Sequence, residues 1–134
     1  MKNLLLILLF PVLINAQINT AEYYLDPGQS IHYFDDEWKK STKSESDFYR
    51  IVTLDSNNMP ISKIKDYYKS GKIQAIIDGA ISIDNNDDSN SKFDGNSIVY
   101  YESGQVSVER FYKNGKTDGV STGYYESGKV YYTY

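Results

Sequence analysis

Cysteine is absent from the 134 residues, and histidine occurs once, at His32. Without cysteine the chain has no disulfide, thiolate nucleophile, iron–sulfur cluster or cysteine-bound zinc, and no cysteine to carry a lipoprotein anchor. Proline occurs three times and tryptophan once. A chain this short is normally one domain, which excludes a large multidomain enzyme.

Basic residues are outnumbered, with 14 Lys and Arg against 18 Asp and Glu, and they form no continuous stripe. This balance disfavours nucleic acid as a partner. The chain also has no basic amphipathic helix, so strong membrane binding is not expected. Tyrosine is abundant, with 14 copies against 5 Phe and 1 Trp. Because aromatic rings pack well on a pleated surface, this bias favours β-structure.

Residues 1–16 have the features of a secretory signal peptide. Lys2 precedes an apolar run at 4–14, and the small residue Ala16 follows the run. The run is shorter than the ~20 residues that a membrane-spanning helix needs. We therefore expect an exported protein, located in the periplasm, the cell envelope or the medium.

The chain contains an internal repeat. The segments KFDGNSIVYYESG and KTDGVSTGYYESG start at residues 92 and 116, 24 residues apart, and 9 of their 13 positions are identical. An earlier partial copy occupies 67–72, and a polar run near 84–91 separates it from the next copy. A repeat of this length indicates an array of similar units. We expect the polar run to be a flexible inter-repeat loop.

Turn residues punctuate the repeats at regular places. They are Gly71, Gly104, Asn114, Gly115, Asp118, Gly119 and Gly128. Asn-Gly and Asp-Gly are strong hairpin signals, and the run at 105–113 alternates with the period of a strand. The sequence therefore predicts an all-β fold of tandem antiparallel hairpins in one elongated, twisted sheet, with the repeats at 67–134 and the last repeat incomplete.

Residues 17–66 show no copy of the repeat. The segments YFDDEW at 33–38 and FYRIVTL at 48–54 are predicted to be two strands around a polar connection. Their expected role is a short N-terminal β cap, because the end of a repeat array exposes unpaired backbone.

The stretches 100–119 and 124–134 resemble the variant MORN repeat of bacterial exported proteins, some of which are catalogued as antitoxin-like repeat proteins. The shared features are paired aromatic residues, an acidic residue, a glycine turn and a KNGK-type turn. The segment before the repeats more loosely resembles that of Bacteroidetes-like envelope proteins. The resemblance implies a β-hairpin array with interaction roles, and it supplies no catalytic residues.

His32 is the first candidate for chemistry. It lies close in sequence to the acidic run 35–37 and has the residue type of a general base or a metal ligand. No second histidine, cysteine or nucleophile motif accompanies it. We expect a surface histidine, no catalytic residues, no cofactor and no enzymatic activity.

The polar run also offers a weak calcium candidate. Asp84, Asn86 and Asp88 have the spacing of the first three ligands of a calcium loop. Ser89 stands where the loop needs glycine, and Gly95 stands where it needs a bidentate glutamate. A soluble loop without metal is the preferred interpretation.

The sequence favours a non-enzymatic protein–protein interaction module. The candidate partner-binding residues are Tyr100, Tyr101, Tyr112, Tyr124, Tyr125 and Tyr132. The same tyrosines are also interpreted as structural rungs of the sheet. A partner strand, or a second copy of the chain, is expected to add to the C-terminal strand near 130–134. The alternative is a structural scaffold, or a truncated segment of a longer envelope repeat protein.

Overall fold

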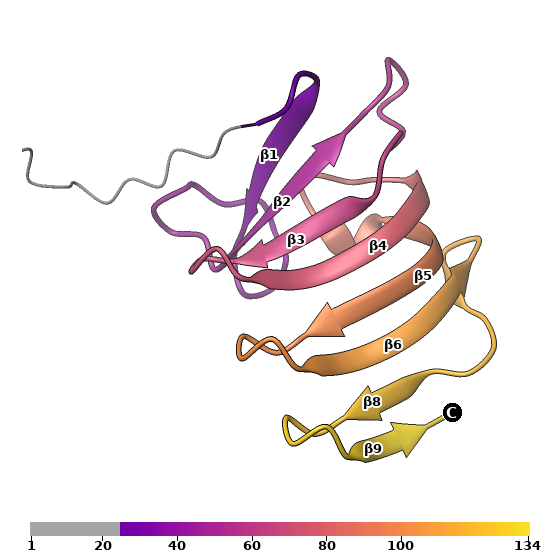
Figure 1. The fold of residues 1–134 in the computed structure, drawn as a ribbon. Helices are drawn as coiled ribbons and strands as arrows, with labels where there is room; N and C mark the ends of the chain where they lie inside the picture. The colour runs from indigo at the N-terminus through magenta and orange to yellow at the C-terminus, as the bar shows by residue number, and fades with distance from the viewer. Residues whose placement is uncertain (1–24) are drawn as a thin grey trace, which may run out of the picture.

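The structure, a computed structural model, describes residues 25–134, so the predicted signal peptide lies outside the described residues. These residues form one open antiparallel sheet (Figure 1). Its strand order is β1-β2-β3-β4-β5-β6-β8-β9. The two-residue strand β7 pairs with β6, as β8 does. Strands that are neighbours in the sheet therefore follow one another along the chain. The predicted all-β sheet of hairpins is confirmed.

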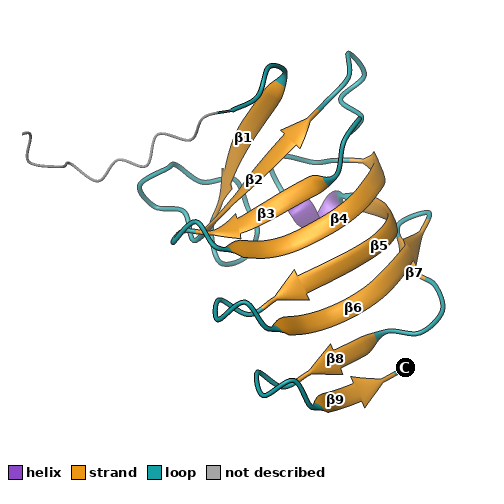
Figure 2. Cartoon of the chain, in the orientation of Figure 1, coloured by secondary structure: helices purple, strands orange, loops and turns teal. Residues whose placement is uncertain are grey.

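Figure 2 shows strands joined by loops, with one turn of helix as the exception. The strands are β1 (Gln29–Phe34), β2 (Phe48–Thr53), β3 (Ile64–Tyr68), β4 (Ile73–Ser82), β5 (Lys92–Tyr100), β6 (Val106–Lys113), β7 (Lys116–Thr117), β8 (Thr122–Tyr124) and β9 (Val130–Thr133). The helical turn is the 3-10 helix η1 (Asp88–Asn90).

The three sequence copies form the same turn. A tyrosine begins each turn: its N–H donates to the carbonyl four residues later, and its own carbonyl accepts from the glycine three residues later. The sets are Tyr68 with Lys72 and Gly71, Tyr101 with Gln105 and Gly104, and Tyr125 with Lys129 and Gly128. All three glycines have φ between 82° and 92°, a region that residues with a Cβ rarely adopt. The partial copy at 67–72 is thus a true structural copy.

The N-terminal segment uses this turn too, which the sequence analysis missed. β1 ends at Phe34, and 35–38 forms a turn in place of the predicted strand. Oδ1 of Asp35 accepts from the N–H groups of Glu37 and Lys39, which makes the turn the preferred local structure. Trp38 takes the glycine position with φ 61°. A second such turn covers 55–59, also with an aspartate first and without glycine.

The Asp-Gly pair at 118–119 is not a hairpin reversal, contrary to expectation. β7 and β8 both pair antiparallel with β6, so the chain keeps its direction between them. The equivalent pair at 94–95 in the first copy lies inside β5, where Gly95 has φ 95° and the register with β4 shifts. Asp-Gly therefore marks a bulge in this repeat.

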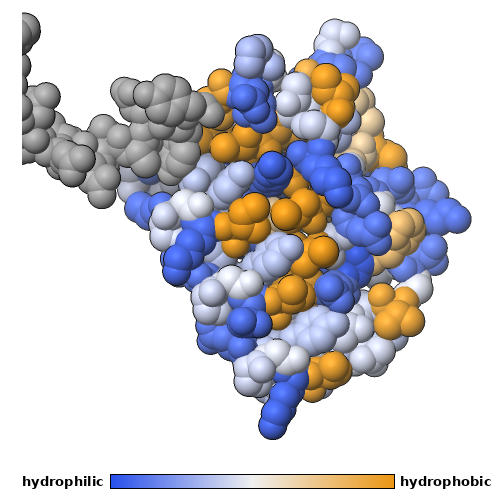
Figure 3. Space-filling model, in the orientation of Figure 1, coloured by the Kyte–Doolittle hydropathy of each residue, from blue (hydrophilic) through white to orange (hydrophobic). Residues whose placement is uncertain are grey.

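The two faces of the sheet differ. The Arg50 face carries the buried core of Val52, Ile64, Ala75 and Ile77, and η1 lies behind the sheet on this side in Figure 2. The opposite face, seen in Figure 3, has apolar side chains gathered over the middle strands among polar ones. No helix among the described residues is long and apolar enough to span a membrane.

Candidate functional site

A ladder of tyrosines connects successive copies of the repeat. The hydroxyl of Tyr68 donates to the carbonyl of Tyr100 at 2.7 Å, and the hydroxyl of Tyr101 donates to the carbonyl of Tyr124 at 2.7 Å. In both cases the second tyrosine of one copy bonds the first tyrosine of the next. This tyrosine ladder fixes the spacing between hairpins, so Tyr100, Tyr101 and Tyr124 have structural roles.

Tyr125 occupies the next position in the ladder but lacks its acceptor. Its side chain is 51% exposed, and among residues 25–134 its hydroxyl has no hydrogen-bond partner. Its ring packs edge-on against Tyr131 with centroids 4.8 Å apart. The hydroxyls of Tyr68 and Tyr101 therefore have carbonyl acceptors within the described chain, and the hydroxyl of Tyr125 has none.

The adjacent strand β9 pairs with β8 on one side and with no described strand on the other. Ser121 and Tyr134 exchange both backbone hydrogen bonds. Because hydrogen-bonded and non-bonded pairs alternate in an antiparallel ladder, the backbone of Tyr132 also points toward β8. The N–H and C=O groups of Thr133, which lies opposite Thr122 between these two residues, therefore face the open side.

The sequence of β9, VYYT, contains neither the charge nor the proline that often protects an edge strand. Val130, Tyr131 and Tyr134 are 57%, 63% and 84% exposed. We call this surface the β9 edge: the outward backbone of Thr133 together with the side chains of Tyr125, Val130 and Tyr134.

The structure separates the six tyrosines that the sequence selected. Tyr125 and Tyr132 lie at the C-terminal hairpin, where the Tyr132 ring covers Gly123. Tyr124 also donates its hydroxyl to Glu109 at 2.8 Å, and this bond raises the pKa of Tyr124. Tyr112 lies on the Arg50 face against Phe93. The sequence indicated strand 130–134 but not which of its backbone groups face outward, because the register of this strand shifts at the bulge beside Tyr124.

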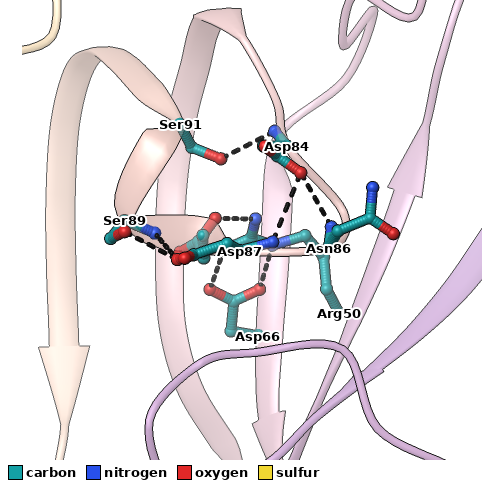
Figure 4. Close-up of polar contacts among 8 residues, drawn as sticks. Arg50, Asp66, Asp84, Asn86, Asp87, Ser89 and Ser91 are labelled. Atoms are coloured by element: carbon teal, nitrogen blue, oxygen red, sulfur yellow. Dashed lines mark hydrogen bonds and ion pairs between the residues drawn. The ribbon is translucent and has the colours of Figure 1, made fainter.

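A buried ion cluster lies on the Arg50 face (Figure 4). Arg50 is fully buried and donates from Nε and Nη2 to the two carboxylate oxygens of Asp66, at 2.7 and 2.9 Å. It also donates from Nη1 and Nη2 to Asp88, at 2.6 and 3.1 Å. Arg50 and Asp66 are direct cross-strand partners, whereas Asp88 comes from η1. The sequence analysis assigned no role to Arg50.

Aromatic rings enclose this arginine. Its guanidinium carbon lies 5.4 Å from the ring centroid of Phe34, 5.8 Å from Trp38 and 5.5 Å from Phe93. Burial alone lowers the pKa of a guanidinium, but the two carboxylates outweigh it and raise the pKa of Arg50. Burial raises the pKa of Asp66, and Arg50 acts against that shift. The cluster fixes η1 to the sheet.

The polar run 84–91 is therefore held in place, in contrast to the flexible loop that we expected. Asp84 Oδ1 accepts from the N–H groups of Asn86 and Asp87, at 2.8 and 3.3 Å (Figure 4). The carboxylate of Asp88, another of the three calcium candidates, binds Arg50. In the described part of the chain, no group of three or more His, Cys, Asp or Glu side chains is placed to hold a metal ion.

His32 is half-buried on β1, opposite Arg50. Its Nε2 lies 2.9 Å from the Ser30 hydroxyl. Burial lowers the pKa of His32, and the positive charges of Arg50 and Lys40 lower it further. The acidic run 35–37 belongs to the turn and forms no hydrogen bond with this imidazole.

Comparison with known proteins adds the repeat class. Residues 93–114 and 117–134 match the family model of the MORN repeat variant. These two segments overlap β5–β6 and β7–β9, the copies with the highest mutual identity. Both segments are thus similar to this repeat. No curated protein and no solved structure matches the chain.

Proposed function

We propose that this chain is a non-enzymatic, exported protein–protein interaction module that captures a β-strand or hairpin at the β9 edge. The observation that carries the proposal is the free third ladder position, Tyr125, beside the unpaired backbone of Thr133. Backbone hydrogen bonds supply affinity in such strand addition, and side-chain pockets supply specificity. The signal-like residues 1–16 support export.

The repeat indicates which kind of strand could pair with the β9 edge. Within the chain, β6 pairs with β8 so that Val108 lies opposite Gly123. The position equivalent to Val108 in the next copy is Tyr132, 24 residues later. A strand that reproduces β8 would place its glycine opposite Tyr132, and its tyrosine carbonyl would accept from the Tyr125 hydroxyl. The favoured partner therefore contains a tyrosine-rich hairpin of this repeat type.

A synthetic peptide with the sequence of residues 121–134 tests the proposal, because it contains the β8–β9 hairpin alone. We expect saturable binding to the chain, measured by calorimetry. Thr133→Pro removes an outward N–H group without removing a bond to β8, so it should weaken binding by about tenfold or more. Tyr125→Phe should weaken binding too, because it removes the ladder hydroxyl.

Tyr67→Phe is the matched control. Tyr67 also belongs to a tyrosine pair, but its substitution should leave the affinity unchanged because it lies on β3, away from the β9 edge. Equal affinity of the peptide for the wild type and for Thr133→Pro, with both proteins folded, would contradict strand addition at this edge.

The free ladder position also favours a second candidate, in which the hairpin belongs to the same polypeptide and the chain is part of a longer scaffold. The gene distinguishes the two. Another tyrosine pair with a glycine turn in frame after codon 134 would favour the scaffold, and unrelated sequence would favour a separate partner.

A further inference from the structure

A cavity of about 280 Å³ lies on the Arg50 face, away from the β9 edge. It is open to solvent and is bordered by the sheet, Trp38 of the 35–39 turn and Asp88 of η1. Its lining includes the aromatic residues Trp38, Phe93 and Tyr112 and the charged residues Asp66, Asp88 and Arg110. Apolar side chains of β4 and β5 complete it, together with the polar Gln74 and Ser97. Ligand sites of about 300 Å³ and above hold small molecules, so this cavity has room for a compact one.

Arg110 is the charged group in this cavity whose hydrogen bonding is incomplete. Its Nε is buried and has no partner among residues 25–134, and no described carboxylate forms an ion pair with it. Its cross-strand neighbour on β5 is the uncharged Ser97. Arg50, on the same face, donates four hydrogen bonds. A buried donor without an acceptor is unfavourable, so Arg110 favours an acceptor that enters the cavity.

An aromatic wall connects the two arginines. The guanidinium carbon of Arg50 lies 5.5 Å from the Phe93 centroid, and Phe93 lies 5.7 Å from Tyr112. The guanidinium carbon of Arg110 lies 5.8 Å from Tyr112. Contact with the ring restrains the Arg110 guanidinium. The wall offers apolar surface to the body of a ligand next to a positively charged end.

We propose that this cavity binds a small monocarboxylate with an apolar or aromatic body, and that Arg110 binds the carboxylate. A guanidinium pairs with a carboxylate through two parallel hydrogen bonds, which suits the unsatisfied Nε. Arg50, Asp66 and Asp88 together carry one net negative charge beside the cavity. An anion of higher charge, such as phosphate, is disfavoured for that reason. The site is independent of strand capture at the β9 edge.

Trp38 provides the readout, because it is the single tryptophan of the chain and lines the cavity. Tryptophan fluorescence is titrated with hydrocinnamate and with hydrocinnamyl alcohol, its uncharged analogue. The acid should bind at least about tenfold more tightly than the alcohol, the effect of one charge-assisted hydrogen bond or more. Inorganic phosphate should bind more weakly than hydrocinnamate.

Arg110→Gln should reduce the affinity for hydrocinnamate to that of the alcohol and leave the alcohol unaffected. Lys113→Gln is the matched control, because it removes the same charge from an exposed position on the same strand and should change neither affinity. Should Arg110→Gln unfold, Arg110→Lys tests the same point: it keeps the charge but loses the paired donors, and should bind the acid more weakly than the wild type.

Three results would overturn the assignment. The first is absence of binding, or equal affinity of the wild type for the acid and the alcohol. The second is an unchanged affinity for hydrocinnamate in a folded Arg110 variant. The third is tighter binding of phosphate than of hydrocinnamate, which would assign the cavity to a different anion.

Discussion

Removal of Asp66 should be among the most destabilising single changes in this chain. Asp66→Ala leaves the guanidinium of Arg50 fully buried and deletes two of its four hydrogen bonds, those of 2.7 and 2.9 Å. Loss of one partner from a buried ion pair costs about 3–5 kcal/mol. Domains of this size are stable by about 5–15 kcal/mol, so the loss is a large fraction of the total. Asp88→Ala should cost less, because the Asp88 side chain is 12% exposed against 3% for Asp66.

Urea unfolding measures these costs, with Trp38 as the probe because it stacks on Phe48 at 4.7 Å. The triple variant Arg50→Met, Asp66→Leu and Asp88→Leu removes all three charges of the cluster, and it should recover most of the stability lost in Asp66→Ala. Lys63→Met is the control, since its ion pair is exposed and should contribute less than about 1 kcal/mol. A cost below about 1 kcal/mol for Asp66→Ala, or additive losses in the triple variant, would refute this account.

Three further changes test the turns, the ladder and the imidazole. Tyr101→Phe should lower the free energy of unfolding by about 1 kcal/mol, because a hydrogen bond is lost, and Tyr125→Phe should leave it unchanged, as measured by urea unfolding. Gly95→Ala should destabilise the fold more than Gly104→Ala, as measured by thermal unfolding. Both glycines have positive φ, but only at Gly95 would an added Cβ lie too close to a neighbour, 2.7 Å from Cβ of Asp78. In the folded state the pKa of His32 lies below its ordinary 6.5, so unfolding near this pH takes up a proton. The free energy of unfolding should therefore decrease as the pH falls from above 6.5 toward the pKa of the folded state. His32→Gln should remove that slope in urea titrations at several pH values.

The repeat region could be predicted because glycine marks its turns. Gly71, Gly104 and Gly128 carry the positive φ that this turn requires, so the sequence repeat and the structural repeat coincide. The turn at 35–39 was missed because Trp38 takes this backbone conformation in place of glycine, as Asn58 does in the turn at 55–59. The aspartate at the start of each was the available signal, since its carboxylate accepts from the N–H groups of the turn.

The ion cluster and the orientation of the β9 edge could not be read from the sequence. Arg50 and Asp88 are 38 residues apart, and they meet because the polar run 84–91 returns to the sheet. That return depends on packing of the whole Arg50 face. Which residues of β9 face outward depends on the bulge next to Tyr124, since an extra residue reverses the alternation of the backbone groups. A bulge of this kind has no reliable sequence signal.

Amide hydrogen exchange of the chain, alone and with the hairpin peptide of residues 121–134, tests strand capture most directly. In the free chain, the amides of Tyr132 and Tyr134 should be protected and that of Thr133 should exchange fast, because only the first two are bonded within the sheet. With the peptide, the Thr133 amide should become protected while the other two stay so. Peptide binding that leaves the Thr133 amide fast would contradict strand capture at the β9 edge.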